Sequence, residues 1–171
     1  MGCCDDRDRD GSGTEKIIEH MKRRNAREYV LQFLYGTDFI IHVAFEKEKV
    51  QILPDLKDDL SLFWRETRED SEEIKKFADD LILGTIDNLE EIDSLIQKVA
   101  EKWKLLRMAT VDRNILRAAT YELLFRNDIP SAVTINEAIE IAKKFSTAES
   151  ASFINGILDK IAKEYRQPSG V

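Results

Sequence analysis

Apolar residues recur at helical spacing along most of the chain, and the alternation typical of β-strands is rare. From about residue 16 onward, apolar positions are separated by three or four residues, as they are on the buried face of an α-helix. Residues that interrupt regular structure are scarce, because the chain contains only 7 Gly and 3 Pro. The pattern therefore predicts an all-α fold.

About seven amphipathic helices account for this pattern and would form a compact bundle. Ser71 is the predicted N-cap of the third helix. Thr134 and Glu137 have the Thr-x-x-Glu spacing of a capping box and predict the start of the sixth. Residues 49–53 are interpreted as a loop rather than a short strand. The predicted helices cover residues 16–45 (with 22 as an alternative start), 55–66, 70–88, 89–103, 111–125, 135–145 and 148–165.

The composition is that of a soluble globular protein, and the length fits one domain or two small subdomains that share a core. Hydrophobic residues make up 43% of the 171 positions and charged residues 35%. No segment approaches the ~20 consecutive apolar residues that span a bilayer, and the N-terminus has no apolar signal core. We therefore expect a cytoplasmic protein without a membrane partner. Residues 1–20 predict a disordered N-terminal extension, residues 21–165 the folded domain and residues 166–171 a flexible C-terminal tail.

Residues that could catalyse a reaction or bind a metal form no recognisable group in the sequence. Glycine-rich phosphate-binding loops are absent from it. The histidines His20 and His42 are too few and wrongly spaced for a helical zinc site, and Cys3 and Cys4 stand next to each other. We therefore expect a binding protein rather than an enzyme, with no metal and no cofactor.

One group of cations contrasts with the acidic character of the chain. The formal net charge is -7, yet four cations fall within six positions at the start of the first predicted helix: Lys22, Arg23, Arg24 and Arg27. The helix dipole disfavours each of them there by about a few tenths of a kcal/mol. The cluster predicts a surface that meets a nucleic acid, with Tyr35 as a ring for base stacking. Two other interpretations stay open: the cations pair with carboxylates of the same chain, or they meet an acidic protein.

Three segments of the chain resemble a known family. They read "RRNAREYVLQFLY", "VDRNILRAATYELLFRNDIPSAVTINEAIEIAKKF" and "SFINGILDKIAKE". Together they are similar to the NusB family of bacterial transcription antitermination factors, over about residues 21–165 and most strongly in the C-terminal third. The segment 46–70 is longer and less typical, and residues 1–20 lie outside the resemblance.

The resemblance implies a NusB-like fold, which is all-α and built as two packed helical subdomains. It also implies a protein that binds the single-stranded boxA element of nascent RNA, chiefly in ribosomal RNA leaders. A small-subunit ribosomal protein that serves as the factor NusE would bind with it. The complex would join RNA polymerase and other Nus factors and suppress premature termination. Some relatives self-associate, so a homodimer also stays open.

The resemblance further implies which side chains take part in binding. Asp112 and Arg113 match a region near the partner surface. Phe153 matches an aromatic residue that approaches the RNA, although it also fits the apolar stripe of the last helix. Asn155 and Gly156, in the same motif, are interpreted as positions that let helices pack closely. The residues implied in RNA binding are Arg23, Arg24, Arg27, Tyr35, Arg113, Arg117 and Phe153.

Two positions near the end of the chain qualify the resemblance. Ser146 stands where the family usually has a glycine, so the turn after the sixth helix is expected to differ. Glu149 is an acid beside the implied RNA path. We expect it to limit affinity, so that Glu149→Asn would tighten boxA binding.

Three other classes of protein compete with this interpretation. A methyltransferase fused to a NusB-like module is not expected, because the sequence contains no cofactor-binding domain. A helical protein that binds duplex DNA would prefer that ligand to boxA RNA in a competition experiment. An interaction protein that binds only the ribosomal protein would gain no affinity from RNA.

Overall fold

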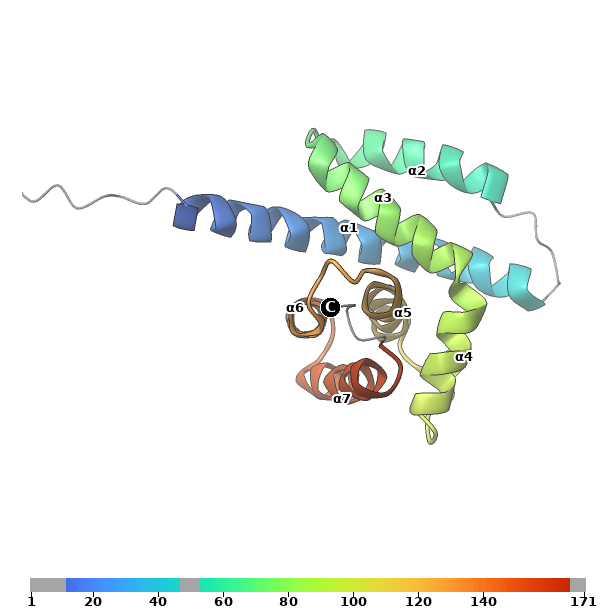
Figure 1. The fold of residues 1–171 in the computed structure, drawn as a ribbon. Helices are drawn as coiled ribbons and strands as arrows, with labels where there is room; N and C mark the ends of the chain where they lie inside the picture. The colour runs from blue at the N-terminus through green and yellow to red at the C-terminus, as the bar shows by residue number, and fades with distance from the viewer. Residues whose placement is uncertain (1–11, 47–52, 167–171) are drawn as a thin grey trace, which may run out of the picture.

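The computed structural model describes residues 12–46 and 53–166. Within these ranges the regular structure is helical throughout, as the sequence predicted (Figure 1). The elements are α1 (Ser12–Glu46), α2 (Leu53–Thr67), α3 (Glu72–Asp87), α4 (Leu89–Val99), the short 3₁₀ helix η1 (Leu105–Arg107), α5 (Thr110–Phe125), α6 (Ser131–Phe145) and α7 (Ala148–Glu164).

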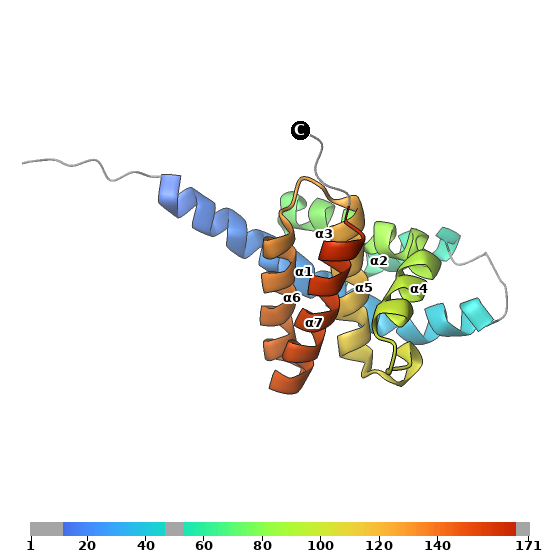
Figure 2. The same cartoon turned by 60° about the horizontal axis from the view of Figure 1, so that its bottom comes forward.

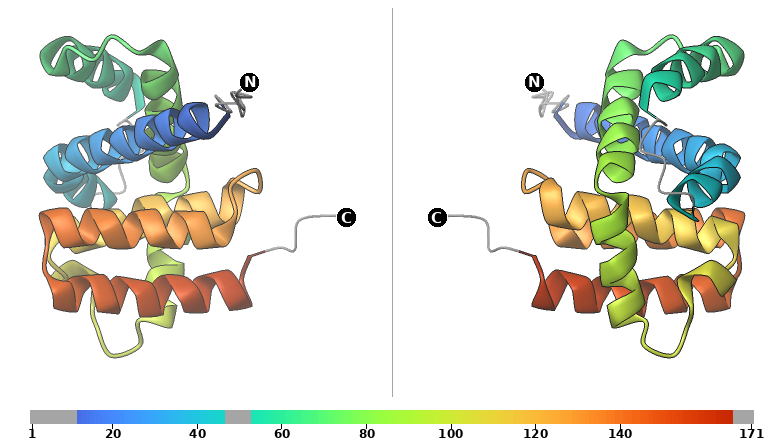
Figure 3. Two further views of the ribbon diagram at one scale, coloured as in Figure 1. Left: turned by 90° about the vertical axis from the view of Figure 1, so that its left-hand side faces the viewer. Right: turned by 90° about the vertical axis from the view of Figure 1, so that its right-hand side faces the viewer.

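The helices form two groups that meet along α1. α2 and α3 lie on one side of α1, whereas α5, α6 and α7 lie on the other (Figure 1, Figure 3). α4 follows α3 directly and packs against α5 and α7, so it links the two groups. The longest helix, α1, has 35 residues and spans roughly 50 Å.

Each group has its own hydrophobic core, which confirms the two packed subdomains. One core joins the apolar faces of α1, α2 and α3. The other joins α4, η1, α5, α6 and α7, and α1 adds Leu31 to it. The largest side chains that are completely buried among the described residues are Leu34, Leu81, Ile82, Leu89, Ile92, Ile96, Leu116, Leu123, Ile129, Ile154 and Leu158.

The two subdomains also meet where α3 contacts α5. Tyr121 of α5 packs against both hydrophobic cores. A Cβ atom placed on Gly84 of α3 would overlap the Tyr121 ring. The absence of a side chain at Gly84 therefore lets α3 pack directly against the Tyr121 ring.

α1 starts earlier than either predicted start, residue 16 or residue 22. The helix begins at Ser12, so residues 12–20 of the predicted N-terminal extension are helical. Residues 13–20 are exposed, and this end of α1 projects from the body of the protein (Figure 2). Of the other predicted tails and loops, residues 1–11, 49–52 and 167–171 lie outside the described residues.

The helix ends follow sequence signals only in part. Ser71 is the N-cap of α3, as predicted, and its hydroxyl accepts a hydrogen bond from the Ile74 amide at 3.4 Å. The capping box at Thr134 is wrong, because α6 begins three residues earlier, at Ser131 after Pro130. The fourth helix ends at Val99 rather than at residue 103, so the segment that follows it is a turn.

Candidate nucleic-acid interface

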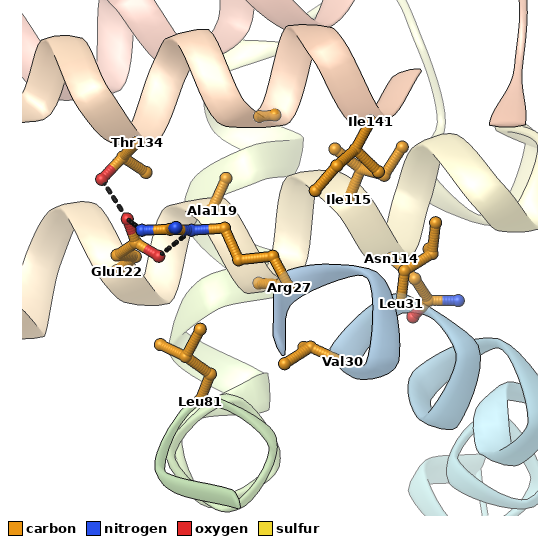
Figure 4. A pocket seen from close by; sticks show the side chains of 12 residues that line it. Arg27, Val30, Leu31, Leu81, Asn114, Ile115, Ala119, Glu122, Thr134 and Ile141 are labelled. Carbon is orange, nitrogen blue, oxygen red and sulfur yellow. Dashed lines mark hydrogen bonds and ion pairs between the residues drawn. The ribbon is translucent and has the colours of Figure 1, made fainter. Parts of the chain in front are cut away.

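Arg27 is an interior residue rather than part of an exposed cationic surface. It lies on the face of α1 that packs on α5, and its guanidinium donates two hydrogen bonds to Glu122, at 2.9 and 2.7 Å (Figure 4). Thr134 of α6 donates a further hydrogen bond to the same carboxylate. All three side chains are buried. Arg27 therefore joins α1, α5 and α6, and the predicted RNA contact through this side chain gives way to an internal role.

Arg24 lies at the boundary between the interior and the surface. Its guanidinium donates to both oxygens of Glu137 on α6, at 3.0 and 2.7 Å, and 37% of its side chain is exposed. The hydrogen bond to Glu137 raises the pKa of Arg24 above its ordinary value. His20 lies beside the pair, with Nε2 3.2 Å from Glu137 Oε1. Glu137, which was predicted to cap α6, therefore pairs with Arg24 of α1 instead.

Arg23 is the most accessible of the three arginines at this end of α1. Its only ion pair in the described part of the chain joins it to Glu19 at 2.8 Å, one helical turn away, and 43% of its side chain is exposed. The guanidinium also lies 5.7 Å from the centre of the Phe77 ring. A groove of about 210 Å³ opens here between α1 and α3, with Lys22 and Lys76 on its walls.

Arg113 and Arg117 are buried, and both bind Asp38 of α1. Arg113 Nη2 lies 2.5 Å from one Asp38 oxygen, and Arg117 Nη1 lies 2.7 Å from the other. Arg117 also makes a bidentate pair with Asp93 of α4 at 2.7 and 2.6 Å. This network ties α1 and α4 to α5. The predicted RNA contacts of Arg113 and Arg117 are therefore replaced by internal ion pairs.

The same network controls the ionisation of Asp38. Burial by itself would raise the pKa of this carboxyl. Hydrogen bonds from Arg113 and Asn114, together with the charges of Arg113 and Arg117, outweigh burial and hold the pKa below its ordinary value. Asp38 is therefore a carboxylate that the fold keeps charged.

Asp112, predicted at the partner surface, is also buried. Its two oxygens accept hydrogen bonds from the hydroxyls of Ser146 and Ser150, at 2.6 and 2.7 Å. Ser146 ends α6 with a negative φ of -134°, outside the left-handed region that would favour the glycine usual in the family. Asp112 thus holds the turn between α6 and α7.

The remaining predicted residues stay at the surface. Tyr35 on α1 and Glu149 in the first turn of α7 are exposed. Phe153 is half-buried, and its ring packs edge-on against Trp103, with the ring centres 5.8 Å apart. Gly156 is exposed, and a Cβ atom there would meet nothing within 4 Å, so its interpretation as a helix-packing position is wrong.

The described residues offer a surface for binding and little that could enclose a ligand. A cavity beside Arg27, at the meeting of α1, α3, α5 and α6, measures about 30 Å³, which is room for one water molecule (Figure 4). Within residues 12–46 and 53–166, no group of three or more His, Cys, Asp or Glu side chains is placed to hold a metal ion. No helix in the same ranges is long and apolar enough to cross a membrane.

Sequence reasoning found the arginines but missed the acids that bind four of them, Arg24, Arg27, Arg113 and Arg117. Glu122, Glu137 and Asp38 are the partners, and they lie far from the arginines in sequence. One signal was available, because Glu137 falls among the buried apolar positions of α6. Acids are almost never fully buried unless they are paired, so an acid in an apolar stripe indicates a buried cation nearby.

Fold and site together define a helical protein of two subdomains with an arginine-bearing helix at their boundary. The model of the NusB family matches residues 24–163, and the chain therefore belongs to the NusB family. A relative from Thermodesulfovibrio yellowstonii, transcription antitermination protein NusB, is 54% identical over 145 residues, covering 84% of this chain and 93% of that protein. The protein of the same name from Geobacter sulfurreducens is 47% identical over 140 residues, covering 82% and 93%.

Solved structures have the same fold. T. maritima NusB is 44% identical, with a TM-score of 0.69, covering 85% of this chain and 93% of that one. The antitermination factors NusB and NusE in complex with double-stranded RNA include a chain that is 24% identical, with a TM-score of 0.69, covering 85% and 98%. The second likeness shows the fold alone.

Proposed function

We propose that this protein is a transcription antitermination factor that binds single-stranded boxA RNA together with the small-subunit ribosomal protein NusE. Membership of the NusB family supports the proposal, as do relatives named transcription antitermination protein NusB. A protein of the same fold was solved with NusE and RNA. The complex would join RNA polymerase and other Nus factors in the cytoplasm, and the protein would act by binding rather than by catalysis.

The observation that carries the proposal is the pair of partly exposed guanidiniums of Arg23 and Arg24. Each guanidinium has five N–H donors, and the internal carboxylates use only some of them. The Arg23–Glu19 pair lies at the surface, where such pairs are worth about 0–1 kcal/mol. An RNA phosphate could replace Glu19 at little cost.

Aromatic side chains supply the second part of the proposed contact. Tyr35 offers an exposed ring further along α1, and Phe153 offers a half-buried ring on α7. Stacking of a base on an aromatic ring is worth about 1–3 kcal/mol and tolerates any base. Glu149, exposed at the start of α7, stays a predicted limit on affinity, because its charge would repel phosphate.

The interior arginines have a different part in the proposal. Arg27, Arg113 and Arg117 position α1 against α5 through buried carboxylates. In this way they fix where Arg23 and Arg24 stand. Their replacement would lower binding indirectly, by disturbing the helix that carries the contacts.

Titration of a fluorescein-labelled, single-stranded boxA RNA tests the proposal, with and without NusE. We expect the wild-type protein to bind boxA RNA more tightly than a scrambled RNA, a double-stranded RNA or duplex DNA, and NusE to increase that affinity. Arg23→Ala combined with Arg24→Ala should weaken binding about tenfold or more, because two phosphate contacts are lost. Arg65→Ala with Lys163→Ala, which removes two exposed cations elsewhere, is the charge-matched control.

The outcomes separate the competing classes. Equal affinity for boxA and scrambled RNA, or a preference for duplex DNA, would contradict the proposal. Binding to NusE with no contribution from RNA would show an interaction protein instead. An unchanged dissociation constant in the Arg23 and Arg24 variant would remove this end of α1 from the RNA surface.

A further inference from the structure

Trp103 is a large aromatic side chain in an unusual position, at the surface. It lies in the turn between α4 and η1, and 60% of the residue is exposed. The sequence placed it at the end of a longer fourth helix, residues 89–103, but that helix ends at Val99. Leu106, three residues on, is equally exposed at 59%. Exposed apolar side chains of this size gain no stability from burial in the core, so their exposure calls for another explanation.

The Trp103 ring continues the aromatic surface of Phe153. The ring centres are 5.8 Å apart and the planes meet at 65°, so the Phe153 ring packs edge-on against the indole. Phe153 is the residue of α7 that the proposed function places near RNA. Trp103 is the more exposed of the two residues, because 60% of it is exposed whereas Phe153 is half-buried.

The turn that carries Trp103 is held in place. Gln97 of α4 donates its side-chain amide to the Trp103 carbonyl at 3.0 Å and accepts a hydrogen bond from the Leu105 amide at 2.9 Å. Leu105 is buried in the second core, and Arg113 donates to its carbonyl at 3.3 Å. The ring is thus presented on a fixed support, which lowers the entropic cost of binding a ligand.

Three cations without a carboxylate partner lie within four positions of Trp103 in the chain, in the same turn and in η1. Lys102, Lys104 and Arg107 are all exposed, and none makes an ion pair within the described part of the chain. The acid of the same turn, Glu101, is engaged by Lys160 at 3.4 Å. Arg23 and Arg24 of α1, by contrast, are both paired with carboxylates. The turn that carries Trp103 therefore presents positive charge that no carboxylate of the described residues neutralises.

We infer that Trp103 and Phe153, with Lys102, Lys104 and Arg107, form a second binding site for single-stranded RNA. A base stacks on the Trp103 indole and the three cations hold the adjoining phosphates, the combination by which proteins bind single strands. The inference rests on the proposed function for the nature of the ligand. It adds the turn between α4 and η1, which lies on the opposite side of α5 and α6 from α1, to the RNA path (Figure 3).

Replacement of the ring tests the stacking contact with the full-length protein and the labelled boxA RNA. Trp103→Ala should weaken binding about fivefold or more, the equivalent of one stacked base. Trp103→Phe keeps a ring and should stay within about twofold of wild type. Leu106→Ala is the matched control, since it removes an equally exposed apolar side chain from the same turn, and its affinity should not change.

Fluorescence reports the contact directly. The chain contains two tryptophans, and Trp64 is half-buried, with its indole nitrogen 2.7 Å from Asp79. In a Trp64→Phe variant whose circular dichroism matches wild type, Trp103 is the only tryptophan, and saturating boxA RNA should quench its emission. In Trp103→Phe, which retains Trp64, the same RNA should change the emission by less than a tenth.

Failure of the inference is distinguishable from failure of the proposed function. Tight boxA binding that depends on Arg23 and Arg24, together with wild-type affinity in Trp103→Ala, would overturn the second site and leave the function intact. Weakened NusE binding in Trp103→Ala, with unchanged RNA affinity, would overturn it as well and show a protein contact. No binding of boxA RNA by the wild-type protein would overturn both.

Discussion

Whether an arginine serves the interior or the surface depends on what lies opposite it in the fold. Arg27 and Arg24 are one turn apart on α1, yet Arg27 is buried against Glu122 whereas Arg24 keeps part of its side chain in solvent. Charging a buried group is costly unless it is paired, and removing one partner leaves the other uncompensated. Each buried ion pair therefore stabilises the contact between its two helices only while both partners are present.

Asp38 offers a test of this principle through pH. Because its folded pKa lies below the ordinary value of about 3.9, its contribution to stability is complete above that value and is lost as pH falls through the folded pKa. Asp38→Asn should lower the free energy of unfolding at pH 7 by about 3 kcal/mol, since Arg113 and Arg117 lose a shared anion. The difference from wild type should shrink as the pH falls below about 4 and through the lowered pKa of Asp38.

Urea unfolding at a series of pH values measures this effect. Asp58→Asn, which removes an exposed carboxylate from α2, is the control and should cost less than about 0.5 kcal/mol. A constant difference between Asp38→Asn and wild type across the whole pH range would contradict the argument.

At the scale of the helices, the sequence predicts features that are set by residues close together in the chain and misses features that are set by contacts between helices. The stripes of apolar residues predicted the seven helices because each stripe is set by residues three or four positions apart. The sixth helix starts early because Thr134 and Glu137 bond to other helices instead of capping their own. The buried arginines could not be recognised because their partners lie 95 positions away for Arg27 and 75 for Arg113.

Gly84→Ala tests the close approach of α3 and α5. The added methyl group would overlap the Tyr121 ring, and overpacking of a core costs about 1–3 kcal/mol. Alanine also favours the helix by about 1 kcal/mol relative to glycine, so we expect a net loss of about 1 kcal/mol, and at most about 2 kcal/mol, in thermal or urea unfolding.

Gly36→Ala is the matched control for this experiment. Position 36 is exposed within α1, with nothing within 4 Å of an added Cβ atom, so the same substitution should stabilise the protein by about 0.5–1 kcal/mol. The two glycines thus predict opposite signs. Stabilisation by Gly84→Ala would show that the Tyr121 ring moves aside freely.

At the scale of the molecule, an acidic protein can meet RNA only through local surfaces. The formal net charge of -7 repels a polyanion at long range. Much of the positive charge is already neutralised internally, as in the pairs of Arg27, Arg113 and Arg117. The number of phosphate contacts is therefore small, and the affinity of the protein alone should be modest and sensitive to salt.

Salt dependence counts these contacts. For single-stranded RNA, the logarithm of the binding constant falls with the logarithm of salt concentration by about 0.7 for each phosphate neutralised. Replacing Arg23 and Arg24 by alanine should reduce the slope by about 1.4. Arg27→Ala should lower the melting temperature while leaving the slope close to wild type, because its guanidinium is buried. An equal loss of slope in Arg27→Ala would place that side chain on the RNA.

The projecting start of α1 has a consequence for how solvent reaches the backbone. Residues 13–19 are exposed, and a helical segment much shorter than about 12–15 residues is marginal by itself. From Ala26 onward the same helix is anchored in the first core. Backbone amide protons of the outer turns therefore exchange with deuterium long before those of residues 26–34. The part of the helix that stays protected from exchange therefore begins close to Arg23, Arg24 and Arg27.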